Sequence, residues 1–354
     1  MSKINSYNVY DIFWLIITFL FNLRITVLRI CDIKTNIFTI IIILLSLSLI
    51  NIKRFRIEGL AIIFFILFFL GTTHGLSLIL ILLLTYLSRY IDITRLAGFN
   101  FFLSSIFFIL NYYIMQLGYA HIEYYDLTYK GGQILSDFGY GNTNTFSFYL
   151  FYISISLYLY CKRKNTLLYF IIIAIAYFSY YLTGSRTVLL SNIIFIFLSL
   201  IQKTKIKNIL FCKTALYILP IGIIVIILFF TYHSFEYPII DNLFSLRFSY
   251  SLKALESMSL LNYIIGFDIP DDIIIDIAYY SLLCTAGILG LIVFLTLYFK
   301  AIKKININSP LLPVIVSYMI SGMSENNMMN SIFLGGMFLW FILYKTAFPP
   351  YRLY

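Results

Sequence analysis

The stretch Thr183-Gly184-Ser185-Arg186-Thr187 places an arginine between two apolar segments, residues 166–182 and 187–201. Gly184 favours the end of one helix, and Ser185 or Thr187 could cap the next. The free N–H groups at a helix start attract anions, and a guanidinium group can bind two phosphate oxygens at once. Arg186 is therefore a candidate ligand for a phosphate-bearing substrate. Pairing with an acid or a lipid headgroup is the structural alternative.

Further charged residues of interest lie in the segment 232–277, which contains Arg247 and Lys253. Two arginines, Arg186 and Arg247, could stabilise the charge of a departing diphosphate without a metal ion. For Arg247 and Lys253, an ordinary loop charge is the alternative.

Carboxylates cluster just before the apolar segment that begins near residue 278, at Asp268, Asp271, Asp272 and Asp276. Their spacing does not match a calcium-binding loop. A partly buried carboxylate can accept a proton from a hydroxyl group, and Asp276 is the best candidate because it is nearest the apolar segment. Glu325 is a second candidate. A solvated acidic surface is the alternative for all of them.

Metal and cofactor motifs are not evident in the sequence. Its histidines, His74, His121 and His233, fit no zinc spacing, and its four cysteines form no C-x-x-C pair. A phosphate-binding G-x-x-x-x-G-K-[ST] loop is also lacking. We therefore expect no metal site, no cofactor and no disulfide framework.

The composition indicates a membrane protein. Of the 354 residues, 61% are hydrophobic and 11% are charged, whereas soluble domains carry about 25% charged residues. The net charge of +10 lies in short loops between apolar runs rather than on a soluble basic face, so nucleic-acid binding is not expected.

Apolar runs of spanning length or slightly less predict an all-α polytopic protein with about twelve transmembrane helices in a single integral membrane domain, 1–354. The runs cover residues 10–30, 36–50, 57–72, 75–90, 99–118, 143–161, 166–182, 187–201, 213–231, 278–299, 310–323 and 329–346. Arg24 and Arg29 lie in the first of them. A central arginine costs about 2.5–3.5 kcal/mol on insertion, which this apolar run can offset, so we favour a structural role for both.

Charge then sets the predicted orientation. Most of the 25 basic residues fall in alternate short loops, which places those loops and both termini in the cytoplasm. Arg186 and Arg247 are exceptions on the outer side. Two longer outward loops, 119–142 and 232–277, are predicted, the larger one preceding the tenth helix. Within it, Phe244–Leu261 is predicted as an interfacial helix.

Several motifs together give a family resemblance. Thr183-Gly184-Ser185-Arg186-Thr187 resembles the S-R motif of the O-antigen and capsular-polysaccharide polymerases, which are related to the O-antigen ligases. Arg247 with Ala254-Leu255 and Gly266 is similar to the second arginine region of these proteins. Asp276 stands eleven residues before Gly287-Ile288-Leu289-Gly290, where ligases show a histidine. Gly141-Asn142-Thr143-Asn144 resembles another polymerase feature, with threonine where proline is common.

The resemblance, which covers most of the chain, implies a metal-independent, inverting glycosyltransferase of the GT-C type in the bacterial cytoplasmic membrane. Donor and acceptor would be glycans linked to undecaprenyl diphosphate, joined at the outer face into O-antigen or capsule. Arg186 and Arg247 would bind the donor diphosphate, and Asp276, or else Glu325, would act on the acceptor hydroxyl. Partners would include the bilayer, a chain-length regulator and a flippase.

Two other functions remain open at the level of sequence. A lipid-linked oligosaccharide flippase or other transporter would place ionisable groups or broken helices near the membrane midplane. An O-antigen ligase is the second alternative, and the aspartate at position 276 speaks against it.

Overall fold

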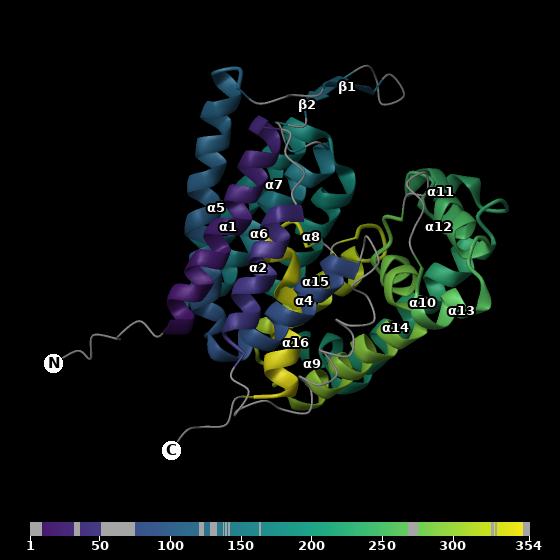
Figure 1. Ribbon diagram of the computed structural model, residues 1–354. Helices are drawn as coiled ribbons and strands as arrows, with labels where there is room; N and C mark the ends of the chain where they lie inside the picture. Colours follow the sequence, from purple (N-terminus) through teal and green to yellow (C-terminus); the bar gives the residue numbers. More distant parts are fainter. Residues whose placement is uncertain are drawn as a thin grey trace. The chain divides into compact units, whose positions relative to one another are not determined.

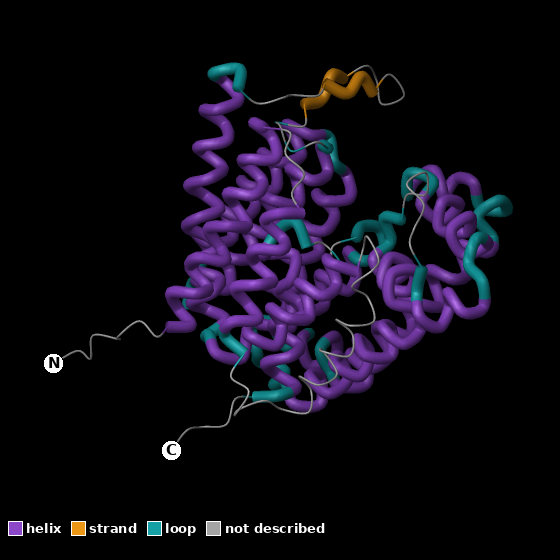
Figure 2. Tube along the Cα trace, viewed as in Figure 1, coloured by secondary structure: helices purple, strands orange, loops and turns teal. Residues whose placement is uncertain are grey.

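The protein is a helical membrane protein in the computed structural model, which describes residues 9–31, 36–50, 75–119, 124–127, 133–136, 138, 140, 142–162, 164–267, 275–326, 329 and 331–349. Helices make up most of these residues, as Figure 2 shows. The chain forms two compact units. Unit 1 comprises residues 1–50, 87–192 and 332–335, and unit 2 comprises the remainder.

Unit 1 is built from four long helices, a shorter one and a strand pair (Figure 1). The helices are α1 (Val9–Cys31), α2 (Asn36–Ser48), α5 (Ile93–Gln116), α6 (Thr143–Tyr160) and α7 (Thr166–Thr183). The short helix η2 (Ser88–Tyr90) and the start of α8 (Arg186–Ile201) belong to the same unit. Strands β1 (Tyr124–Leu127) and β2 (Gln133–Ser136) pair antiparallel within the predicted loop 119–142.

Unit 2 contains the C-terminal helices and most of α4. Its long helices are α10 (Lys213–Tyr232) and α14 (Ala278–Lys304). The shorter ones are α4 (Gly75–Leu87), α9 (Lys207–Leu210), α11 (Pro238–Leu243), α12 (Arg247–Glu256), α13 (Leu260–Ile265), α15 (Leu311–Ser321) and α16 (Phe338–Ala347), together with most of α8. The short helix η4 (Leu334–Met337), just before α16, is divided between the two units. The described residues of the predicted outward segment 232–277 therefore contain three short helices. Helix α12 lies within the helix predicted over Phe244–Leu261 but is shorter, and its interfacial position stays a prediction.

Five described helices are long and apolar enough to cross a membrane. They are the Val9–Val27 part of α1, together with α5, α7, α10 and α14, and five shorter apolar helices accompany them. Many large apolar side chains on these helices are exposed, such as Phe170 and Tyr177 of α7. Lipid is the environment that can cover so much apolar surface. The predicted span 57–72 lies outside the described residues, and the total of about twelve spans remains a prediction.

Helix α6 is the core of unit 1. Every residue from Phe146 to Leu159 is buried, and α5 and α7 both pack against it. Three buried serines, Ser147, Ser154 and Ser156, lie on this helix and hydrogen-bond to its own carbonyls. Because protein rather than lipid surrounds it, α6 can carry these polar residues.

Two lysines of the predicted cytoplasmic loops also have a structural role. Lys213 Nζ donates to the carbonyl oxygens of Lys303 and Ile305 at the end of α14, at 3.3 and 2.6 Å. Lys304 Nζ donates to the Ala347 carbonyl at the end of α16, at 2.6 Å. Cations satisfy the unpaired carbonyls and complement the dipole at helix C-termini.

Candidate functional site

Arg247 is the centre of an ion cluster inside unit 2. Its Nη1 lies 2.7 Å from Glu325 Oε1, and its Nε lies 3.1 Å from Asp276 Oδ2. Nη1 also donates to the Ser324 carbonyl. Three of the four predicted site residues, Arg247, Asp276 and Glu325, therefore meet at one place.

The three side chains differ in exposure. The side chains of Arg247 and Glu325 are 5% and 8% exposed, whereas that of Asp276 is 40% exposed. The Nε contact with Asp276 is close enough for an ion pair but is not aligned as a hydrogen bond. Arg247 and Glu325 are thus the buried members of the cluster. The Asp276 carboxylate is its solvent-accessible member.

A strained turn sets the position of Arg247 at the first residue of α12. Ser245 and Leu246 have positive φ angles of 58° and 61°. Non-glycine residues adopt this left-handed region at a cost, and such strain persists where the surroundings impose it. Arg247 directly follows this turn as the first residue of α12, and its side chain is buried.

Asp241 holds that turn in place, although nothing in the sequence marked it. It is only 2% exposed. Its Oδ1 accepts hydrogen bonds from the N–H groups of Phe248 and Ser249, at 3.0 and 3.4 Å, and its Oδ2 accepts one from the Ser249 hydroxyl. Asp241 thereby caps α12 from outside it. An ordinary cap lies two or three residues before the N–H it binds, so the longer spacing here hid the role.

Backbone contacts between α14 and the end of α15 bring the two carboxylates to Arg247. Ala278 N–H donates to the Gly322 carbonyl at 3.0 Å, just after Asp276. The Tyr279 hydroxyl donates to the Met319 carbonyl, also at 3.0 Å. Because Glu325 follows Gly322 by three residues, these bonds fix the spacing between the two acids.

Glycines let α13 pack directly on a break in α14. Gly287 has φ 64° and ψ −170° inside α14, which interrupts the helix. The Cys284 carbonyl accepts a hydrogen bond from Phe267 N–H at 2.8 Å. A Cβ on Gly266 would lie 2.4 Å from the Thr285 carbonyl oxygen, and one on Gly287 would lie 2.1 Å from that of Ile264. Two of the glycines that carry the family resemblance are therefore required by close backbone approach.

Tyr263 on α13 adds a further link to α12. Its hydroxyl donates to the Leu255 carbonyl at 2.8 Å. Burial first, and then nearby Tyr232, Cys284 and Glu256, raise the pKa of Tyr263.

Arg186 belongs to unit 1, where it is exposed at the first residue of α8. Gly184 ends α7 in the left-handed conformation, as the sequence indicated. Ser185 is buried, and its Oγ donates to Asn144 Oδ1 at 2.8 Å. The convergence of Arg186 with Arg247 and Asp276 remains a prediction, because they belong to different units.

The Ser185–Asn144 bond joins two segments that the sequence singled out separately. Asn142 caps α6 by accepting a hydrogen bond from Asn144 N–H at 2.7 Å. Ser147 and Thr183 share a hydrogen bond of 2.7 Å one turn further in. The segment 142–144 therefore supports the turn that presents Arg186, an arrangement that spacing along the chain could not reveal.

Other predicted residues have simpler surroundings or lie outside the described part. Lys253 is exposed beside the Tyr250 ring, and His233 pairs with the exposed Glu236. Arg24 is 8% exposed within α1. His74, His121, Asp268, Asp271, Asp272 and the side chain of Arg29 lie outside the described residues. Among those described, no group of three or more His, Cys, Asp or Glu side chains could hold a metal ion.

Comparisons with family models, curated proteins and solved structures find no match to this chain. The fold and composition define a helical membrane protein.

Proposed function

We propose that this protein joins undecaprenyl-diphosphate-linked oligosaccharide repeat units into O-antigen or capsular polysaccharide at the outer face of the bacterial cytoplasmic membrane. In this proposal it is an inverting, metal-independent glycosyltransferase with about twelve spans and a GT-C-type architecture. The observation that carries the proposal is the Arg247–Asp276–Glu325 cluster, which holds an accessible carboxylate against a buried guanidinium group.

Asp276 would act as the base. The acceptor sugar hydroxyl attacks the anomeric carbon of the donor glycan and forms the new glycosidic bond. The bond from that carbon to the phosphate oxygen breaks, and undecaprenyl diphosphate leaves with the electron pair. The hydroxyl proton passes to the Asp276 carboxylate, which is 40% exposed and so within reach of a substrate.

Arg247 would then have a role different from the one its position in the sequence suggested. Its guanidinium group contacts two carboxylates and a carbonyl. We infer that it chiefly orients Asp276, and that it reaches a diphosphate only if the substrate displaces a carboxylate. Glu325 is too buried to meet an acceptor directly, and its role is to hold Arg247.

Arg186 would bind the donor diphosphate. It is exposed, stands at a helix start and is presented by a turn braced through Ser185 and Asn144. A guanidinium group near free N–H donors stabilises the charge that develops on a departing diphosphate.

Purified protein in liposomes, supplied with a synthetic polyprenyl-diphosphate repeat unit, tests the proposal. A ladder of longer glycans is expected. The Asp276→Asn variant should lower the rate about 10²–10⁴-fold, the range that a general base contributes. Glu236→Gln is the matched control, because Glu236 is an exposed acid of the same segment. Movement of the lipid between leaflets without a ladder would show a flippase. A wild-type rate in the Asp276→Asn variant would show that Asp276 is not the general base.

A further inference from the structure

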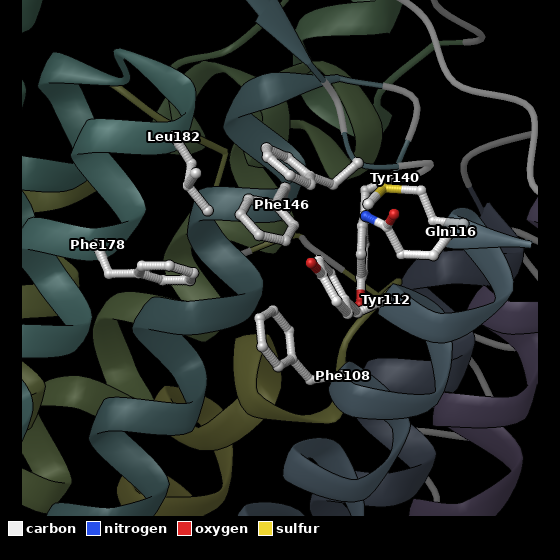
Figure 3. Close-up of a pocket in the computed structure, with 9 residues that line it drawn as sticks. Phe108, Tyr112, Gln116, Tyr140, Phe146, Phe178 and Leu182 are labelled. Atoms are coloured by element: carbon white, nitrogen blue, oxygen red, sulfur yellow. The ribbon is translucent and has the colours of Figure 1, made fainter.

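Unit 1 contains a cavity of about 470 Å³. None of the residues proposed for the chemistry lines it. This volume is within the roughly 300–1,000 Å³ of ligand pockets. Aromatic side chains dominate the wall: Phe108, Tyr112, Phe138, Tyr140, Phe146 and Phe178. Figure 3 shows Phe178 and Leu182 facing Tyr112 and Tyr140 across the opening. Such a wall suits an apolar occupant.

One side of the cavity is rigid. Phe146 and Tyr140 are 2% and 3% exposed, and Phe138 stacks on Phe146 with ring centroids 4.7 Å apart. The Tyr140 hydroxyl accepts a hydrogen bond from Asn111 Nδ2 at 3.1 Å. Asn111 in turn is held by the Thr26 hydroxyl at 2.8 Å. The pocket wall is therefore formed before any ligand arrives.

The other side is open towards the surface that we assign to lipid. Tyr112 of α5 and Phe178 of α7 are 49% and 44% exposed. Both helices are long and apolar enough to span a membrane. A ligand could therefore enter sideways from the bilayer.

The cavity also lies at the end of the helices that carries Arg186. Gln116, the last residue of α5, and Leu182, next to the last residue of α7, both line it. Phe108 lies eight residues before Gln116, so the cavity extends about 12 Å inward from the helix ends. Arg186 follows Leu182 by four residues and is exposed. An apolar chain in the cavity would hold an anionic headgroup near this arginine.

We propose that this cavity binds the first isoprene units of a polyprenyl phosphate or diphosphate, with the headgroup towards Arg186. The lining is mostly aromatic, and the methyl branches of an isoprenoid chain can pack against such rings. The assignment rests on the proposed function for the identity of the lipid.

Photolabelling of the full-length protein in phosphatidylcholine nanodiscs tests the proposal. The probe is a polyprenyl monophosphate with a diazirine on the isoprene unit next to the phosphate, a molecule that carries no glycan to transfer. Labels should map to cavity residues such as Phe146 and Phe178. Unlabelled polyprenyl phosphate should displace the probe, and phosphatidylglycerol at ten times that concentration should not. Equal displacement by phosphatidylglycerol, or labels spread evenly over α7, would overturn the assignment.

Two variants sharpen the test. Leu182→Trp fills the cavity, and Phe178→Ala removes an exposed wall ring without disturbing the core. Each should weaken probe binding about ten-fold, whereas Phe170→Ala, a lipid-facing change on the same helix outside the cavity, should not. If Leu182→Trp does not fold, Phe178→Ala decides, and wild-type binding by that variant would overturn the proposal.

The binding and polymerisation outcomes are separable. Pocket labelling in a protein that makes no glycan ladder would reject the polymerase and retain the lipid site. A ladder formed at the wild-type rate by Leu182→Trp would retain the polymerase and reject the site.

Discussion

The guanidinium group of Arg247 and the carboxylate of Glu325 lie 2.7 Å apart, and both side chains are more than nine-tenths buried. These two residues are 78 positions apart in the sequence, and Arg247 also contacts the Asp276 carboxylate. A buried ion pair contributes little net stability when intact, but removing one partner leaves an uncompensated charge. The contact therefore couples the geometry of the site to the folding of unit 2.

Breaking this pair should be more harmful than replacing it. Arg247→Met alone should lower the free energy of unfolding by about 3–5 kcal/mol, because the buried Glu325 carboxylate loses the guanidinium group. Glu325→Leu should lower it less, because Asp276 still contacts Arg247, and the double variant should recover most of the Arg247→Met loss. Thermal unfolding of the detergent-solubilised protein measures the difference. Simple addition of the two single effects would contradict a coupled pair.

Removing the cap on α12 should affect both stability and the site. Asp241→Ala should cost about 0.5–2 kcal/mol, because the Phe248 and Ser249 N–H groups lose their acceptor. Asp241→Asn keeps an acceptor and should restore part of the loss. If Asp241 positions Arg247, the alanine variant should lower kcat in the liposome assay, and asparagine should rescue it. Loss of stability at unchanged kcat would limit Asp241 to a structural role.

The break in α14 requires glycine. Gly287→Ala should lose about 1–3 kcal/mol for the positive φ angle alone, and steric overlap with the Ile264 carbonyl adds to that loss. Gly222→Ala is the matched control, because its Cβ would meet no atom within 4 Å in α10. Gly222→Ala should be neutral or slightly stabilising. Equal unfolding temperatures for the two variants would show that the break is not needed.

Replacing Arg186 should lower the rate of polymerisation without lowering the stability of the fold. It is exposed, so Arg186→Ala should leave the unfolding temperature within the small range of surface substitutions. The rate of polymerisation should fall by at least ten-fold, and Arg186→Lys should recover only part of it, because a lysine cannot bind two phosphate oxygens as a fork. Lys253→Ala provides an exposed cation as control. Full-length glycan made by Arg186→Ala at the wild-type rate would exclude the diphosphate role.

Hydrophobicity and charge along the chain were sufficient to predict most helices. The predicted runs 143–161, 166–182 and 213–231 agree with α6, α7 and α10 to within two residues. The length of an apolar segment and the capping residues at its ends are local properties of the sequence, so periodicity and composition predict them directly. The same local signals missed the strand pair at β1 and β2, because its segments are only four residues long.

The site depended on contacts that the sequence does not encode locally. Residue type and spacing predict Asp276 and Arg247 as site residues. Their contact and the near-complete burial of Glu325 require α12, the start of α14 and the end of α15 to pack together. The sequence does not predict the role of Asp241, because its hydrogen-bond partners lie seven and eight residues further along the chain.

The sequence by itself determined a helical membrane protein, the ends of most of its helices and the set of charged residues available for chemistry. These follow from residue type, because burying apolar groups and satisfying backbone hydrogen bonds in lipid leave few choices. Only the tertiary structure decided that Arg247 is enclosed by carboxylates while Arg186 stays exposed, and that an aromatic cavity forms behind Leu182. Those outcomes depend on which helix faces meet, and facing residues lie far apart along the chain.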